Sequence, residues 1–154
     1  MPITVRRYEP ADRDYVISLW DDVFPDSTGH NDAAASIDRK CNVGDGLFFV
    51  AEKNATVVGT IIAGYDGHRG WIYSLAVDPT QRRKGIGSML VQHVEQTLSE
   101  LGCPKVNLQV RSQNSSIVTF YHAIGYDTEE RISMGKLMAG TQRGEPDDAR
   151  ESPS

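Results

Sequence analysis

The chain has 154 residues, of which 16 are Lys or Arg and 21 are Asp or Glu, so its formal net charge at pH 7 is −5. This length suits one domain, and 39% apolar with 24% charged residues is a globular composition that excludes a wholly disordered chain. The acidic balance argues against nucleic acid as a partner, because affinity for phosphate polymers depends on excess Lys and Arg. No apolar run approaches the ~20 residues of a membrane span, and charges at the amino end exclude a signal peptide. We therefore expect a cytoplasmic protein that binds neither membrane nor nucleic acid.

The first half of the chain predicts one strand, two helices and a three-stranded meander. Residues 3–8 alternate as a short strand does. Apolar residues then recur at helical spacing over 12–23, and Asn31 can cap a second, shorter helix. Three β-rich stretches separated by short turns follow, at 47–53, 56–65 and 71–77.

In the second half, the apolar period changes from two to 3.6. A helix is predicted over residues 85–101, a strand over 106–110 and a last helix from Asn114 to Gly125. Residues 126–137 are expected to add one or two closing strands. Residues 139–154 have no apolar side chain larger than Ala, so we predict a domain over 1–138 and a disordered tail over 139–154.

The turn between the third meander strand and the long helix has the pattern of an anion site. Three adjacent cations, Arg82, Arg83 and Lys84, lead into Gly85, Ile86, Gly87 and Ser88 at the start of the helix. A helix start leaves backbone N–H groups unpaired at the positive end of its dipole, and glycines let a phosphate approach those amides. A pyrophosphate would fit there.

Other interpretations of this turn are open. A glycine turn with solvated cations is common before helices, and short glycine patterns are weakly specific. The patterns of a P-loop and of a dinucleotide fingerprint do not occur in the chain. The Cys residues lack the Cys/His spacing of a metal site, so we expect no metal.

The whole arrangement resembles the GNAT superfamily of N-acetyltransferases. The run Arg82-Arg83-Lys84-Gly85-Ile86-Gly87, after Leu75-Ala76-Val77-Asp78-Pro79, matches the strand, turn and helix that bind acetyl-coenzyme A in that family. The run 114–126 (NSSIVTFYHAIGY) resembles a second motif, with Ile117 where Ala is usual. Residues 64–70 and 102–105 are most similar to the YpeA-like bacterial branch, which implies little about substrate.

The resemblance implies a fold, a cofactor and site residues. The fold would be α/β of the α+β kind, with a central mixed, mostly antiparallel sheet of six to seven strands flanked by about four helices. Acetyl-CoA would be the acetyl donor. Its binding residues would be Leu75, Ala76, Val77, Arg82, Arg83, Lys84, Gly85, Ile86, Gly87, Ser88 and Asn114.

Tyr121 stands at the position of the family's general acid. A free thiol has a pKa of about 8.5, so a donor with a somewhat higher pKa, such as a phenol, can supply a proton to the departing thiolate as the C–S bond breaks. By spacing alone Tyr121 could equally be a core residue, because it shares a helix face with Ile117 and Ile124. Asn114 could likewise cap the last helix instead of contacting the cofactor.

The general base and the acceptor are not fixed by the sequence. Where related enzymes carry a glutamate, this chain has Gln109, which cannot take a proton. Asp66, His68, Glu52 and Asp22 are unranked candidates for the base.

The resemblance implies transfer of acetyl to a primary amine, with a polyamine, amino sugar, antibiotic, amino acid or protein N-terminus as acceptor. A non-catalytic acyl-CoA sensor and an unrelated nucleotide-phosphate binder are the rival functions, and a homodimer is one oligomeric state that the sequence leaves open.

Overall fold

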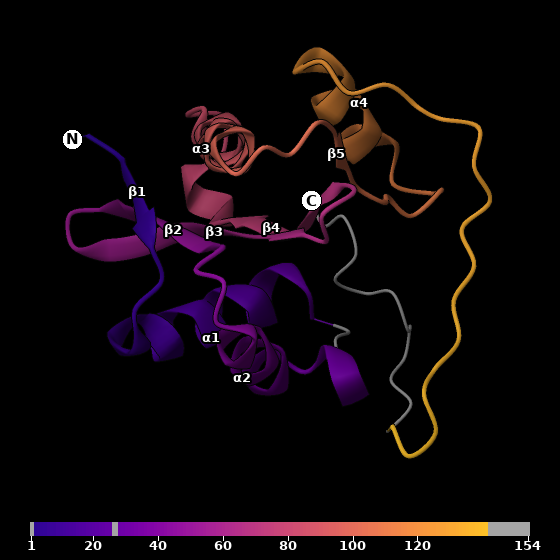
Figure 1. The fold of residues 1–154 in the computed structure, drawn as a ribbon. Coiled ribbons are helices and arrows are strands. Elements are labelled where there is room, and N and C mark those ends of the chain that lie inside the picture. Colours follow the sequence, from indigo (N-terminus) through magenta and orange to yellow (C-terminus); the bar gives the residue numbers. More distant parts are fainter. Residues whose placement is uncertain (1, 26–27, 142–154) are drawn as a thin grey trace.

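The computed structural model describes residues 2–25 and 28–141 and places one sheet between two layers of helices (Figure 1). The sheet has the strand order β1-β2-β3-β4-β5. The first four strands pair antiparallel, and β5 joins β4 in parallel. The strands are β1 (Thr4–Arg7), β2 (Phe48–Lys53), β3 (Thr56–Tyr65), β4 (Gly70–Val77) and β5 (Val106–Asn107).

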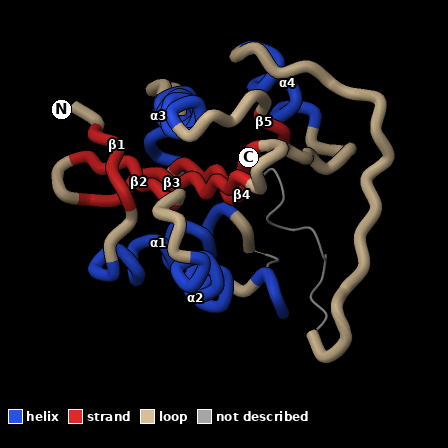
Figure 2. Tube along the Cα trace, viewed as in Figure 1, coloured by secondary structure: helices blue, strands red, loops and turns tan. Residues whose placement is uncertain are grey.

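The four α-helices cover opposite faces of this sheet, as Figure 2 shows. They are α1 (Arg13–Val23), α2 (Ala33–Val43), α3 (Ile86–Glu100) and α4 (Ser115–Ala123). One core cluster joins the sheet to α1 and α2, and a second joins it to α3 and α4. Adjacent β2 residues supply both, because Phe48 and Val50 face α1 whereas Phe49 and Ala51 face α3.

Local sequence signals explain the best-defined hairpin. Asn54 and Ala55 both have positive φ, 51° and 60°, so the two-residue turn between β2 and β3 matches the right-handed twist of the strands. β3 occupies Thr56–Tyr65, the predicted range. The predicted meander and the mixed, mostly antiparallel sheet are confirmed.

The expectation of six to seven strands is wrong, because the described residues form five. The predicted strand at 106–110 keeps only Val106–Asn107. Residues 126–137 form no strand and run outside the sheet, from α4 down the right-hand side of Figure 1. Their consecutive polar residues 127–131 give no apolar face to bury, and Ile132 and Met134 are each 90% exposed. We refer to residues 126–138 as the strap.

The sheet opens between β4 and β5. These strands pair only through Gly70 with Val106 and Trp71 with Asn107. Beyond Trp71 the described part of the chain puts no strand against this edge of β4, so the edge is open as far as Val77. The opening leads to the start of α3, which follows β4 after the short η3 turn, Pro79–Gln81.

None of the helices within residues 2–25 and 28–141 has the length and apolar character needed to cross a bilayer. The predicted tail begins at residue 139, and most of it, residues 142–154, lies outside the described residues.

Candidate functional site

The turn before α3 has the backbone that the anion-site hypothesis requires. Arg83 and Gly85 have positive φ, 66° and 77°, and Gly85 is the residue immediately before the helix. No atom lies within 4 Å of the place where a Cβ of Gly85 would stand, so the space in front of the helix start is open. The positive end of a 15-residue helix therefore faces open space bordered by cations.

A fourth cation belongs to this turn. The ammonium groups of Lys53 and Lys84 both donate to Gln81 Oε1, at 3.2 Å and 3.0 Å. The neighbouring Lys84 ammonium lowers the pKa of Lys53, as a like charge does. Lys53 was not predicted as part of the site, because only the pairing of the hairpin brings the end of β2 beside a turn 28 residues later. Arg82, Arg83 and Lys84 are exposed, as expected.

Gly87 is explained by packing, whereas Gly85 is explained by its backbone conformation. A Cβ on Gly87 would stand 3.2 Å from Phe120 Cζ, so its missing side chain lets α3 and α4 approach closely. Ile86 is buried under the helix, whereas Ser88 is half-buried. Whether Gly87, Ile86 and Ser88 contact a cofactor stays a prediction.

A bulge in β4 lies directly before Leu75, Ala76 and Val77. Ser74 has a φ of 50° and is 3% exposed, and the pairing of β3 with β4 shifts between Thr60 and Ile62. Thr60 Oγ1 donates to the Ser74 carbonyl at 3.1 Å and accepts from Trp20 Nε1 at 2.8 Å. These buried hydrogen bonds hold an uncommon backbone conformation in place.

The bulge sets which backbone groups face the open edge of β4. The N–H of Asp78 donates to Val58 on β3 at 2.8 Å. Since successive residues of an antiparallel strand direct their N–H groups to opposite sides, the N–H of Val77 is directed toward the opening. Leu75 and Ala76 are buried and Val77 is half-buried.

Tyr121 lies on α4 with 2% of its surface exposed. Its ring packs edge-on against Phe120 and Tyr126, at centroid distances of 5.0 Å and 5.5 Å. Its hydroxyl is buried and has no hydrogen-bond partner among the residues that the structure describes. Burial raises the pKa of this phenol. An uncompensated buried hydroxyl is unusual, since such groups normally find a partner, so the core interpretation alone does not account for it.

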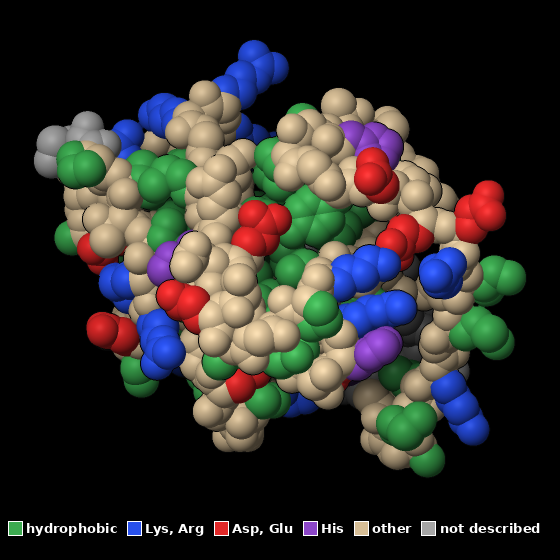
Figure 3. Space-filling model, turned by 45° about the horizontal axis from the view of Figure 1, so that its top comes forward, with side chains coloured by type: hydrophobic (Ala, Val, Ile, Leu, Met, Phe, Trp, Pro, Cys, Tyr) green, Lys and Arg blue, Asp and Glu red, His purple; other side chains and the backbone are tan. Residues whose placement is uncertain are grey.

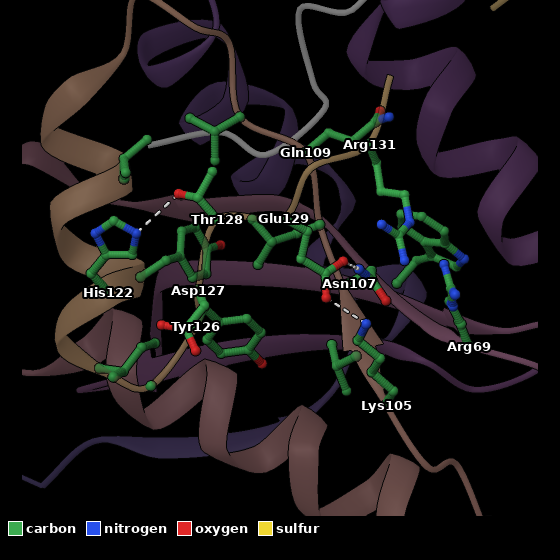
Figure 4. Close-up of a pocket in the computed structure, with 18 of the residues that line it drawn as sticks. Arg69, Lys105, Asn107, Gln109, His122, Tyr126, Asp127, Thr128, Glu129 and Arg131 are labelled. Atoms are coloured by element: carbon green, nitrogen blue, oxygen red, sulfur yellow. Dashed lines mark hydrogen bonds and ion pairs between the residues drawn. The ribbon is translucent and has the colours of Figure 1, made fainter. Parts of the chain in front are cut away.

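A cavity of about 1020 Å³ adjoins Tyr121. Its walls come from the start of β4, the end of α3, segment 103–112, α4 and the strap, and its labelled residues include Arg69, Asn107 and Glu129 (Figure 4). In the turned view of Figure 3 the surface is hollowed, with apolar side chains inside the hollow and charged side chains around it. Of the predicted site residues, only Tyr121 lines this cavity; the anion turn, the end of β4 and Asn114 do not.

The predicted base candidates do not meet in this cavity. Asp66 Oδ1 accepts the N–H groups of His68 and Arg69, both at 2.7 Å, and these bonds lower its pKa and give it a turn role. Glu52 is ion-paired with Arg6 at 2.9 Å. His68 and Asp22 are exposed, and none of the four candidates lines the cavity.

Glu95 and His122, which were not predicted, line the cavity in their place, together with Gln109. Glu95 Oε2 accepts from the Tyr126 hydroxyl at 2.7 Å, and burial together with this carboxylate raises the pKa of Tyr126. His122 Nε2 lies 3.1 Å from Thr128 Oγ1. Gln109 is bonded to Ser133 of the strap. Only the approach of the strap to α3, α4 and segment 103–112 brings these side chains together, so no sequence motif could have predicted the grouping.

Asn114 stands immediately before α4, but its side chain makes no cap hydrogen bond to the helix backbone. Its Oδ1 instead accepts from Ser116 Oγ at 3.3 Å. Capping therefore does not explain this residue, and its contact with the cofactor stays a prediction. The described residues contain no group of three or more His, Cys, Asp or Glu side chains that could hold a metal ion.

Comparison with protein families gives one match over most of the domain. Residues 13–126 match the model of the acetyltransferase (GNAT) family. An acetyltransferase of Yersinia pestis (strain Pestoides F) and one of Pectobacterium atrosepticum are each 39% identical to the chain over 136 residues, which cover 87% of it and 94% of each relative.

Solved structures share the fold at lower identity. The aminoglycoside N-acetyltransferase AAC(6')-Iy in complex with CoA has a TM-score of 0.74 at 17% identity, covering 88% of this chain and 95% of that one. The PaiA N-acetyltransferase of Thermoplasma acidophilum in complex with coenzyme A also has a TM-score of 0.74, at 19% identity, covering 86% and 94%. At these identities the likeness establishes the fold alone.

Proposed function

Since this chain belongs to the acetyltransferase (GNAT) family, we propose that its own residues move the acetyl group of acetyl-CoA directly to a primary amine as follows. The diphosphate of the donor binds at the turn before α3, the thioester enters the opening between β4 and β5, and Tyr121 protonates the leaving thiolate. Fold relatives that hold coenzyme A support this donor.

The observation that carries the donor assignment is the open, cation-bordered start of α3. Gly85 leaves the helix amides accessible, and Lys53 and Lys84 share a single neutral acceptor, Gln81 Oε1. Two ammonium groups so close repel each other unless an anion joins them. A diphosphate supplies that charge and accepts the unpaired N–H groups as well.

In the transfer step, the neutral amine nitrogen attacks the thioester carbonyl carbon and forms the C–N bond. The carbonyl oxygen becomes an oxyanion, and in this proposal the backbone N–H of Val77 at the open edge of β4 stabilises it; the direction of that N–H toward the opening supports the role. The C–S bond then breaks, and the thiolate takes the proton of Tyr121. The amine proton leaves to solvent or to a cavity group, and the same route returns a proton to Tyr121.

The buried environment keeps Tyr121 in the protonated form that this step requires. Its raised pKa keeps the phenol protonated at every working pH, and its hydroxyl has no competing partner among the described residues. The proton can therefore pass to a thiolate without first breaking a hydrogen bond within the protein.

Calorimetric titration with coenzyme A and acetyl-CoA tests the donor assignment. Gly85→Val places a side chain in front of the helix start at a positive φ, and we expect binding to be lost. Gly44→Val is the matched control, because Gly44 also has a positive φ, 71°, with nothing within 4 Å of an added Cβ, but ends α2. No saturable binding by the native protein, or unchanged affinity of Gly85→Val, would refute the assignment.

The rival function, a non-catalytic acyl-CoA sensor, shares this binding site and differs in turnover. Free-thiol release in the presence of an amine panel separates the two, and binding without release would favour the sensor. The cytoplasmic location and the homodimer are further proposals, which fractionation of cells and sedimentation of the purified protein test.

A further inference from the structure

The cavity beside Tyr121 contains two polar groups that have no partner among the residues that the structure describes. Asn107 Oδ1 is buried and accepts no hydrogen bond from the described residues, although the amide nitrogen of the same side chain donates to Glu129 at 2.9 Å. Arg69 is half-buried, and its guanidinium forms no hydrogen bond or ion pair with the described part of the chain. One is an acceptor that lacks a donor, and the other is a cation that lacks an anion.

The carboxylates in the cavity wall do not neutralise Arg69. Both oxygens of Glu129 are engaged, one by Lys105 at 2.5 Å and one by Asn107. Glu95 accepts the Tyr126 hydroxyl. Figure 4 shows Arg69 and Arg131 on the same side of the cavity, away from Asp127. In a protein with a net charge of −5, this wall is a local excess of positive charge.

We propose, as an extension of the proposed function, that the acceptor is a small amine that also carries a carboxylate or phosphate, and that Arg69 binds this anionic group. Arg69 extends from the turn between β3 and β4 and is held at its base by that turn, where Asp66 accepts its backbone N–H. A guanidinium offers parallel donors that match carboxylate and phosphate oxygens. Arg131 adds a second positive charge from the strap.

Asn107 complements this assignment. Its unpartnered Oδ1 can accept an N–H or O–H from the body of the same molecule, as an amino acid or an amino sugar would provide. Asn107 is fixed by its pairing with Trp71 in the sheet and by Glu129. The cavity, at about 1020 Å³, has room for a molecule of this size. An amine substrate without an anionic group would leave the positive charge of Arg69 without a counter-charge.

Matched pairs of acceptors test the proposal, with acetyl-CoA as donor and thiol release as readout. L-lysine against cadaverine isolates the carboxylate, and glucosamine 6-phosphate against glucosamine isolates the phosphate. We expect the anionic member of one pair to have a kcat/KM at least about tenfold higher, and that pair identifies the group. Arg69→Gln should raise KM for this acceptor about 10- to 100-fold, as expected for loss of a charge-assisted hydrogen bond, and leave its neutral counterpart unchanged.

Arg13→Gln, which removes a surface cation paired with Asp38 far from the cavity, is the control and should alter neither member. Equal rates within both pairs, or an unchanged anion preference in Arg69→Gln, would overturn the proposal. If no amine is turned over, NMR titration decides: the Arg69 Nε–H signal should shift with L-lysine or glucosamine 6-phosphate and not with cadaverine or glucosamine, and no shift overturns the inference. Coenzyme A binding, measured in parallel, distinguishes this failure from failure of the proposed function.

Discussion

The buried polar groups between α1 and the sheet differ from those beside β5 in how their hydrogen bonds are satisfied. On the α1 side of β3 and β4, Trp20, Thr60 and the Ser74 carbonyl form a continuous buried chain of hydrogen bonds. On the β5 side, Tyr121 and Asn107 each bury a polar atom that no described residue satisfies. Strands β1 to β4, with α1 and α2, are paired along the sheet, and we call them the closed half. Strand β5, with α4 and the strap, is joined to β4 through two residue pairs, and we call this part the open half.

This contrast separates what the protein needs for folding from what it needs for its reaction. An unsatisfied buried polar atom lowers the free energy of unfolding by about 1–3 kcal/mol. A sequence that served folding alone would not keep such an atom. The closed half shows that the same chain can satisfy such groups. We therefore interpret the open half as the place where ligands complete the hydrogen bonding.

Tyr121→Phe should give the largest effect and sharpen the comparison most. Loss of the proton donor should slow acetyl transfer by about 10²- to 10⁴-fold. The free energy of unfolding should stay the same or rise slightly, because the removed hydroxyl has no partner among the described residues. Steady-state kinetics and chemical denaturation measure the two quantities, and coenzyme A affinity is the control. A loss of stability without a loss of rate would assign Tyr121 to the core.

Trp20→Ala tests the closed half. Trp20 is fully buried. Its ring stacks on that of Phe48, with the ring centroids 5.9 Å apart, and lies tilted against that of Phe24, with the centroids 6.4 Å apart. We expect the free energy of unfolding to fall by about 3–5 kcal/mol, measured by urea denaturation. Ile132→Ala on the strap, where the side chain is 90% exposed, should change it by less than about 0.5 kcal/mol. Similar effects at both sites would contradict the distinction between the halves.

Thr60→Val asks whether the closed half also shapes the open edge. Valine keeps the volume and removes the hydroxyl that joins Trp20 to the Ser74 carbonyl. The free energy of unfolding should fall by about 1–3 kcal/mol. The kcat should also fall, with little change in coenzyme A affinity, because the bulge before Val77 loses the hydrogen bond that supports it. Thr60→Ser keeps the hydroxyl and should restore kcat. A kcat unaffected by valine would limit Thr60 to stability.

The smallest effect concerns acid stability in the closed half. Arg6 donates to both oxygens of Asp12, at 2.8 Å and 2.9 Å, and the N–H of Glu9 donates to Asp12 Oδ2 at 2.8 Å. The Arg6 guanidinium holds the pKa of Asp12 below its usual value of about 3.9. A depressed pKa in the folded state contributes stability above that value, and the contribution is lost as pH falls through the folded pKa. Arg6→Gln should remove about 1 kcal/mol of this dependence in denaturation curves between pH 5 and pH 2. Parallel curves for both proteins would exclude the pair as its source.

Sequence alone predicts most of the closed half, because its signals are local. The alternating apolar residues and the Asn54-Ala55 turn fix β2 and β3, and the apolar stripe fixes α3. The backbone of the turn before α3 is equally local, since Gly85 lies within that segment. These features need no knowledge of distant residues.

The open half was predicted less well, because its structure depends on distant contacts. Whether residues 126–137 form strands depends on an edge supplied by β5, and β5 pairs over only two residues. Lys53 reaches Gln81 only through the hairpin. Gly87 faces Phe120, which no spacing rule distinguishes from a glycine that faces a ligand. The cavity groups were missed for the same reason.

The support of the Ser74 bulge is electrically neutral and enclosed, since Trp20 and Thr60 have no exposed surface. Ionic strength acts on charges in contact with water and scarcely on such an enclosed neutral network. Added salt should consequently weaken capture of the thioester by the exposed lysines and arginines, while the turnover of each complex already formed stays constant. Under the proposed function, ionic strength therefore affects binding of the donor and not the chemical step.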